Sequence, residues 1–364
     1  MPPFIANVLA APVQRVPLDH LRWVVREHAL LIVLVVVYWV AALGVARVYH
    51  LPNNLVPNLL GYAVPLLVPL LLALCWHAVS IMVCVRPERL TLYLIASLKE
   101  SLTRERVLFA LPVILLLPVF ASAFTFFKTA IPVIQPYVWD ARLSEWDRLI
   151  HGGTHPWMLL QTLLGHPLIT GVVNVLYNLW FFVMYSILTL QAFALKDRRL
   201  RMQFLLSFVV TWILLGTLGA IWFSSMGPCY YPSFAQQSGP YAPLMAYLRE
   251  AGEHVPVWAL NVQQMLWDNY QSSKSGIGSG ISAMPSMHVA TSVLLALFGW
   301  RHSRQAGIAL TVYAALIMVG SVHLGWHYAL DGYVGGLGAL VVWWLVGRLL
   351  GRLPTNAEAR LVLT

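Results

Sequence analysis

Long apolar runs recur along this 364-residue chain, and they constrain its fold more than any other feature. A helix needs roughly 20 apolar residues to cross the core of a bilayer, and most of these runs approach that length. Backbone polar groups inside a bilayer must be paired within the segment, so each run is expected to be an α-helix. The sequence therefore predicts an all-α, polytopic membrane bundle of about eight transmembrane helices, at residues 29–48, 59–85, 107–127, 169–195, 202–223, 286–300, 307–325 and 328–350.

The composition supports a membrane protein. Hydrophobic residues make up 59% of the chain and charged residues only 10%, whereas a soluble domain carries roughly 25% charged residues. The net charge of +9 is expected to reflect basic cytoplasmic loops, and no nucleic-acid partner is predicted. The three cysteines contain no Cys-x-x-Cys pair, so neither a disulfide framework nor a zinc–thiolate site is expected.

Basic residues gather in alternate connections between the predicted spans. Because cytoplasmic loops carry the excess of Lys and Arg, eight spans with this pattern place both termini in the cytoplasm. The starts of spans 286–300 and 328–350 then face the periplasm, the extracellular side or a lumen. The residues concerned are Arg15, Arg22 and Arg26; Arg86, Arg89, Lys99, Arg104 and Arg106; Lys196, Arg198, Arg199 and Arg201; Arg301 and Arg304; and Arg348, Arg352 and Arg360.

Two connections on the outer side are too long for simple turns. Segment 128–168 carries several tryptophans and prolines and is expected to form short helices at headgroup depth. Segment 224–284 includes an amphipathic stretch and ends in a Gly/Ser-rich run. Because loops of this length in compact proteins are usually functional or disordered, we expect the second segment to act as a lid or substrate platform.

Two polar clusters stand against predicted membrane helices, where ionisable residues are costly unless they function. The first is Pro285-Ser286-Met287-His288, in which Pro285 suits the start of a helix and the free N–H groups near Ser286 and Met287 suit an anion. The second contains His327 and, four residues later, Asp331. His327 can act as a nucleophile oriented by Asp331, and His288 can protonate a leaving alkoxide and then activate an acceptor hydroxyl.

These clusters resemble the second and third signatures of the type 2 phosphatidic acid phosphatase superfamily. The Met-Pro-Ser-Met-His-Val-Ala form is most similar to the branch of inositol phosphorylceramide synthases and their bacterial relatives, and residues 146–152 resemble an upstream segment of that branch. The resemblance implies a phosphohistidine intermediate on His327, no metal and no cofactor. It also implies a phospholipid donor and a lipid or polyol acceptor. We expect residues 1–106 to form N-terminal membrane helices with a basic loop, and residues 107–364 to form the catalytic core.

The chain departs from the superfamily pattern where cations are concerned. The third signature usually carries Ser-Arg ahead of its histidine, but this chain has Gly320-Ser321 in register with His327, and the first signature is not evident. Candidate phosphate-binding cations on the outer side are Lys274, Arg148 and Arg142. Candidate substrate contacts are His323, Tyr230, Tyr231 and Asn178.

Three alternatives remain open from the sequence. His323, His327 and Asp331 share a helical spacing and could bind a metal ion, although this leaves the first cluster unexplained. The acceptor could be water, which would make the protein a phosphatase of a lipid phosphate or polyprenyl diphosphate. A lipid transporter with a degenerate site is the third alternative, against which the intact His288, His327 and Asp331 stand.

Overall fold

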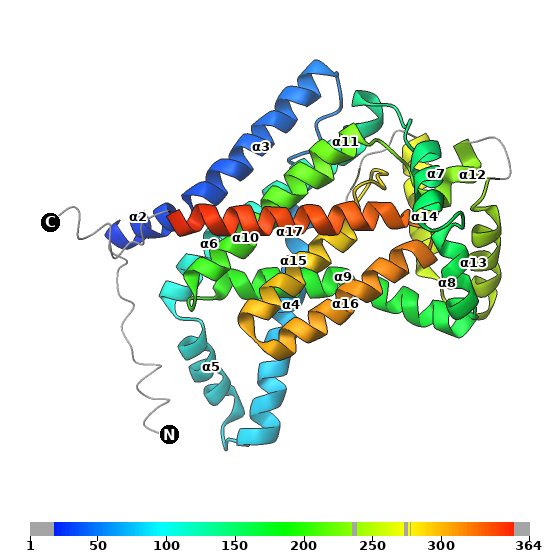
Figure 1. Ribbon diagram of the computed structural model, residues 1–364. Helices are drawn as coiled ribbons and strands as arrows, with labels where there is room; N and C mark the ends of the chain where they lie inside the picture. Colours follow the sequence, from blue (N-terminus) through cyan, green and yellow to red (C-terminus); the bar gives the residue numbers. More distant parts are fainter. Residues whose placement is uncertain (1–17, 235–238, 273–275, 277, 353–364) are drawn as a thin grey trace.

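The computed structural model describes residues 18–234, 239–272, 276 and 278–352, and the described chain is helical without strands (Figure 1). Within these residues, seven helical segments are long and apolar enough to cross a membrane. The predicted all-α polytopic bundle is therefore confirmed, and the protein is an integral membrane protein. The seven segments are α3 (Ala29–Val48), α4 (Leu59–Ser80) with its π-helical extension Ile81–Val85, α6 (Arg104–Ile134), α9 (Pro167–Phe193), α10 (Arg198–Ile213) with the π-helical turn Leu214–Gly219 and α11 (Ala220–Trp222), α16 (Arg304–His323), and α17 (Ala329–Arg352).

The sixth predicted span, residues 286–300, is present as α15 (Met287–His302), whose 16 residues make it shorter than the seven other segments. It forms a helical hairpin with α16 and also packs against α17 and α10. Most of its first turns are buried, including Ala290 and Leu294, which pack with Ala339 of α17. The helix is therefore stabilised by its neighbours within the bundle, and it lies at the centre of the part of the fold that carries both polar clusters.

Apolar side chains on the outer faces of the bundle fit contact with lipid. On α3, Val33, Val36, Val37 and Val40 are exposed although they are aliphatic. Polar side chains instead turn inward and pair, because an unpaired polar group in hydrocarbon is costly. The Tyr38 hydroxyl, for example, lies 2.6 Å from the Thr217 hydroxyl of the π-helical turn after α10.

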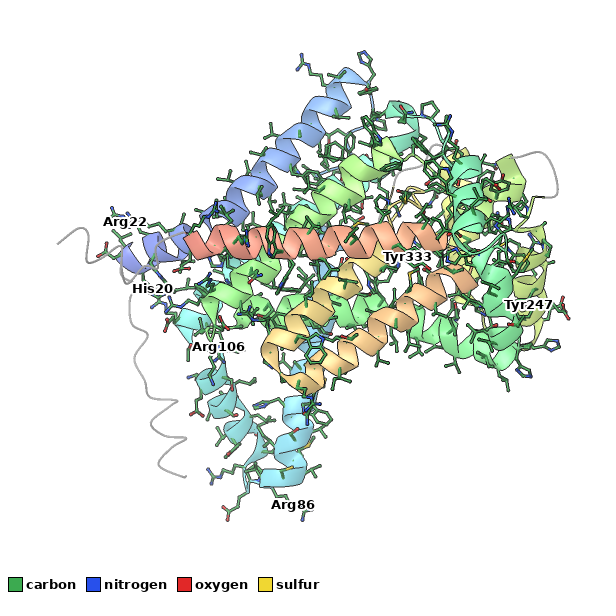
Figure 2. All side chains as sticks on the ribbon, in the orientation of Figure 1. His20, Arg22, Arg86, Arg106, Tyr247 and Tyr333 are labelled. Carbon is green, nitrogen blue, oxygen red and sulfur yellow. The ribbon has the colours of Figure 1, made fainter. Side chains whose placement is uncertain are left out.

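Short helices from the two long outer segments gather at one end of the bundle, and such helices were predicted for residues 128–168 (Figure 1). At the opposite end lie α2 (Leu18–Glu27) and α5 (Leu90–Ser101), and Figure 2 shows Arg22, Arg86 and Arg106 toward that end. The separation of basic residues from the short helices follows the charge pattern of the sequence. The short helices are α7 (Asp140–Ile150), α8 (Pro156–Leu164), α12 (Tyr231–Phe234), α13 (Ala242–His254) and α14 (Trp258–Gln271).

One predicted boundary was wrong in a way that affects the site. Span 107–127 was expected to end before Lys128, which would have placed this lysine in the outer connection. In the structure α6 continues to Ile134, so Lys128 lies inside the helix. Pro132 lies inside the helix, two residues before its end. The side chain of Lys128 is thus directed by the helix and not by a loop.

Candidate active site

The start of α15 supplies the first cluster. Ser286 is the N-cap residue, and its Oγ accepts a long hydrogen bond of 3.5 Å from the N–H of Val289. The backbone N–H of Ser286 donates to the backbone oxygen of Asp331 at 3.0 Å, which joins the two clusters directly. This close approach requires a glycine on α17, because a Cβ at Gly335 would lie 2.5 Å from the Ser286 carbonyl oxygen. Gly335 therefore allows α17 to pack closely against the start of α15.

The turn between α16 and α17 supplies the second cluster. His327 and Trp326 both donate their backbone N–H to the Ser321 carbonyl, at 3.1 and 3.0 Å. The Nδ1 of His327 lies 3.3 Å from Oδ2 of Asp331, whose carboxylate is fully buried and also accepts the N–H of Tyr328 at 3.0 Å. This arrangement orients the imidazole through Nδ1 and leaves its Nε2 free to attack an electrophile.

The two histidines face one another at the same end of the bundle. Their ring centroids are 6.1 Å apart with an interplanar angle of 60°. Since a reacting atom lies about 3 Å from its catalytic groups, this spacing leaves room for one phosphoryl group between the rings. His288 is held from behind by aromatic rings, with centroid distances of 4.8 Å to Tyr177 and 4.3 Å to Trp180.

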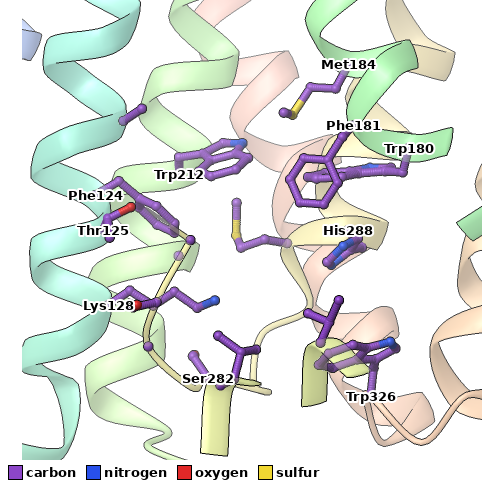
Figure 3. Close-up of a pocket in the computed structure, with 18 of the residues that line it drawn as sticks. Phe124, Thr125, Lys128, Trp180, Phe181, Met184, Trp212, Ser282, His288 and Trp326 are labelled. Atoms are coloured by element: carbon purple, nitrogen blue, oxygen red, sulfur yellow. The ribbon is translucent and has the colours of Figure 1, made fainter. Parts of the chain in front are cut away.

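Both histidines line a cavity of about 260 Å³ that has a polar end and an apolar end (Figure 3). The apolar end is lined by residues of α6, α9 and α10 and lies beside the π-helical turn that contains Gly216. Residues 278–282, which end the second outer segment, line the polar end, so that segment contributes to the site as expected. The apolar end is lined by Leu117, Phe120, Phe124, Met184, Leu188, Phe208 and Trp212, and the polar end by Tyr62, Thr125, Lys128, Asn178, Tyr230, Ser279, Ser282, His288, Trp326 and His327.

Lys128 lines the cavity, and the sequence interpretation did not name it as a candidate site residue. Its side chain extends from α6 into the cavity, across from His288 (Figure 3). It makes no hydrogen bond or ion pair with another described residue, and it is the one Lys or Arg among the described residues that line the cavity. The available signal was a lysine within the apolar stretch of α6 that follows Arg106, because an ionisable residue at such a position in a membrane protein suggests a functional role.

The predicted cations do not lie in the cavity. Arg148 is exposed, and its guanidinium pairs with the carboxylate of Glu145 at 2.7 Å and donates to the Gly153 carbonyl. Arg142 is exposed over the ring of Trp139, 5.4 Å from its centroid. Lys274 falls outside the described residues. Arg148 therefore neutralises Glu145, and Arg142 covers the ring of Trp139, both at the surface of the protein. Among the described residues, the cation that lies in the cavity with the histidines is Lys128.

The remaining predicted contacts divide into two groups. Asn178 and Tyr230 line the cavity, although the Tyr230 hydroxyl donates to the Gln263 carbonyl at 3.0 Å and the Asn178 amide donates to the Asn174 carbonyl at 2.7 Å. Met287 also lines it, whereas Ser286, Tyr231 and His323 do not. His323 instead binds the Thr170 hydroxyl through Nε2 at 2.9 Å. Among the described residues no group of three His, Cys, Asp or Glu side chains is arranged to hold a metal ion, so the proposed metal set is not assembled.

The fold and the site together define a class of polytopic membrane protein in which two histidines, one of them paired with a buried carboxylate, line a largely apolar cavity. The model of the PAP2 superfamily matches residues 141–345, more than half of the chain. The protein belongs to the PAP2 superfamily, whose members are lipid phosphatases and phosphotransferases. No curated protein and no solved structure matches the chain. Lys128 lies outside the matched residues, so the superfamily model does not account for this cation.

Proposed function

We propose that the protein is a lipid phosphotransferase that moves a phospho-headgroup from a glycerophospholipid to a lipid or polyol hydroxyl, in the manner of an inositol phosphorylceramide synthase. The observation that carries the proposal is the pair of histidines, 6.1 Å apart, at the polar end of an apolar cavity. One ring is oriented by a buried carboxylate, and the other is held by aromatic side chains. The reactive groups are thereby placed beside a space suited to a lipid chain.

The reaction proceeds in two displacements at phosphorus. In the first, Nε2 of His327 forms a bond to phosphorus as the bond to the diacylglycerol oxygen breaks, and His288 supplies the proton to that oxygen. In the second, His288 takes the proton of the acceptor hydroxyl, whose oxygen bonds to phosphorus as the bond to His327 breaks. Asp331 keeps the proton of His327 on Nδ1 and offsets the positive charge that the ring gains.

Two features stabilise the negative charge of the phosphoryl group. Lys128 places an ammonium group in the cavity without another polar partner among the described residues. The backbone N–H groups of Met287 and His288, in the first turn of α15, take part in no described hydrogen bond and are favoured positions for an anion. Together they replace the arginines that the superfamily's usual signatures supply.

The charge of the cavity favours a phosphodiester donor. A phosphomonoester carries about −1.5 to −2 charges near neutral pH, whereas a phosphodiester carries one. A single cation among the described cavity residues matches the smaller charge. The apolar lining also disfavours water as the acceptor, because water must be excluded if a phosphohistidine is to react with a lipid hydroxyl. Both features support transfer over hydrolysis.

The second candidate is a phosphatase of a lipid phosphate or polyprenyl diphosphate, which would use the same residues with water as the acceptor. Superfamily membership is equally compatible with it. In either case we propose that the site faces the periplasm, the extracellular side or a lumen, since Arg22 of α2 and Arg106 of α6 lie toward the opposite end of the bundle (Figure 2).

The test uses purified protein with a radiolabelled phospholipid in mixed micelles, with and without ceramide or diacylglycerol as the acceptor. Formation of a labelled product only with the acceptor supports transfer. Release of water-soluble phosphate or headgroup at the same rate without an acceptor would establish the phosphatase instead. A His327→Ala protein serves as the control for contaminating activity, and transport of intact lipid with no bond cleavage would refute both enzymatic candidates.

A further inference from the structure

Helix α7 carries two buried carboxylates that belong to neither histidine cluster. Asp140 and Asp147 are each 1% exposed, and they share the buried face of the helix with Leu143 and Ser144. Their spacing of seven residues, about two helical turns, aligns them on one side of the helix. The exposed side of α7 carries Glu145 and other residues without contacts to the site. A buried ionisable group is costly unless its acceptor positions are filled, so the partners of the two carboxylates are informative.

The partners lie in the two chain segments that frame the site. Asp140 accepts the N–H groups of Met226 and Gly227, both at 2.8 Å, and the hydroxyl of Tyr328 at 2.9 Å. Asp147 accepts the N–H groups of Ala329 and Leu330 at 3.1 and 3.0 Å. Burial raises the pKa of both carboxyl groups, and these donors oppose the shift because they favour the ionised acceptor.

Asp147 completes the hydrogen bonding of the segment that carries His327. The N–H groups of Trp326 and His327 donate to the Ser321 carbonyl, and that of Tyr328 donates to the Asp331 carboxylate. Those bonds are internal to residues 321–331. The N–H groups of Ala329 and Leu330 are instead satisfied by Asp147, which comes from a different helix. Helix α7 therefore contributes to the orientation of the turn relative to the bundle, beside the bond from the Ser286 N–H to the Asp331 carbonyl.

We propose that Asp147, supported by Asp140, is a positioning residue that holds the His327–Asp331 turn in its attacking geometry from outside the turn. This inference rests on the proposed phosphotransfer function. Asp147 also occupies the positive end of α17, because it binds the first N–H groups of that helix. The start of α15 keeps its first N–H groups free, so Asp147 directs the phosphoryl group toward α15 and away from α17.

The test compares Asp147→Asn with a matched control, Glu145→Gln, which removes an exposed carboxylate two residues away on the same helix. Asparagine retains one acceptor, turns an N–H₂ group toward a backbone N–H, and removes the negative charge. Since a displacement of about 1 Å at a reacting group costs on the order of 100-fold in rate, kcat should fall by roughly 100-fold. KM should stay within about threefold of the unchanged protein, because the cavity and Lys128 are untouched.

The assay uses an aryl phosphate and an alkyl phosphodiester beside the lipid donor. Each rate is divided by the amount of monodisperse, folded protein, and the melting temperature of each variant is measured separately. The loss in Asp147→Asn should be equal for aryl and alkyl leaving groups, because the misplaced group is the nucleophile. Asp147→Glu, which keeps the charge but moves it by one methylene, should show a smaller fall in kcat. If Asp147→Asn does not fold, the kcat of Asp147→Glu tests the positioning role.

The results separate this proposal from the one on which it rests. An unchanged protein that cleaves none of these phosphate esters refutes the proposed function. An active unchanged protein, with kcat of Asp147→Asn and Asp147→Glu equal to that of Glu145→Gln, refutes the positioning role alone. A variant that only melts at a lower temperature, with normal kcat for each folded molecule, gives Asp147 a purely structural role and also refutes the proposal.

Discussion

Replacing Lys128 with methionine removes the single Lys or Arg among the described residues lining the cavity while keeping most of the apolar stem. A hydrogen bond to a charged group contributes about 1.5–3 kcal/mol, and two unit charges 4 Å apart interact by about 4 kcal/mol at an effective dielectric constant of 20. In Lys128→Met, the free N–H groups at the start of α15 still supply part of this stabilisation of the phosphoryl charge. We therefore assign about 2–3 kcal/mol of transition-state stabilisation to Lys128, which corresponds to a fall in kcat/KM of about 30- to 150-fold.

The assay measures kcat/KM for transfer from a labelled phospholipid in mixed micelles, for the unchanged protein, Lys128→Met and Lys128→Arg. Arginine retains the charge and should keep most of the activity. Arg142→Met removes an exposed cation that lies over Trp139 outside the cavity, and it should stay within about twofold. A Lys128→Met protein within threefold of the unchanged rate would refute the assignment, as would an equal loss in Arg142→Met, since only general surface charge would then be involved.

Four further outcomes are expected. His327→Ala should abolish turnover and any trapped phosphoenzyme, whereas His288→Ala should be inactive on an alkyl ester but partly active on an aryl phosphate, because a phenolate leaves with little protonic help; phosphoenzyme trapped on His288 would reverse the roles. Asp331→Asn should remain folded by circular dichroism and lose roughly 10³-fold or more in kcat, as the amide can stabilise the wrong tautomer; a loss under tenfold would contradict this. In a background without native cysteines, cysteines at Gly278 and Arg304 should react with an impermeant reagent from opposite sides of the membrane, Gly278 from outside; labelling of both from one side would contradict the orientation. Activity should survive exhaustive chelation, and loss with EDTA followed by rescue with a divalent ion would require a metal-dependent mechanism.

The cavity combines residues from inside and from outside the region that matches the PAP2 superfamily. The model matches residues 141–345, which include both histidine clusters and nearly all of α7. Lys128 and Tyr62 line the same cavity but precede the matched region. The Tyr62 hydroxyl accepts the N–H of Gly278 at 2.9 Å, so helix α4 contacts the segment that closes the polar end. The N-terminal helices therefore complete the walls of a cavity whose reactive residues come from the matched region.

The sequence alone determined the class of fold and located the two polar clusters. Membrane helices are local features, because each needs only a sufficiently long apolar run, and α3 occupies the predicted residues 29–48. The pairing of His327 with Asp331 was also predicted from their spacing of four residues, but it forms across the start of α17, because His327 precedes the first residue of that helix. The hairpin of α15 and α16 follows from the short connection between them and brings His288 and His327 to one end.

Only the tertiary structure decided which charges belong to the site. Arg148 and Lys128 were both basic residues near the outer end of the bundle, but a difference of a few residues in the end of α6 turns Lys128 into the cavity, and a local ion pair holds Arg148 outside it. The contacts of Asp147 with Ala329 and Leu330 join residues more than 180 positions apart. Periodicity reports which face of a helix is apolar, but it does not report which distant backbone groups a buried carboxylate will bind, because that depends on how the helices pack.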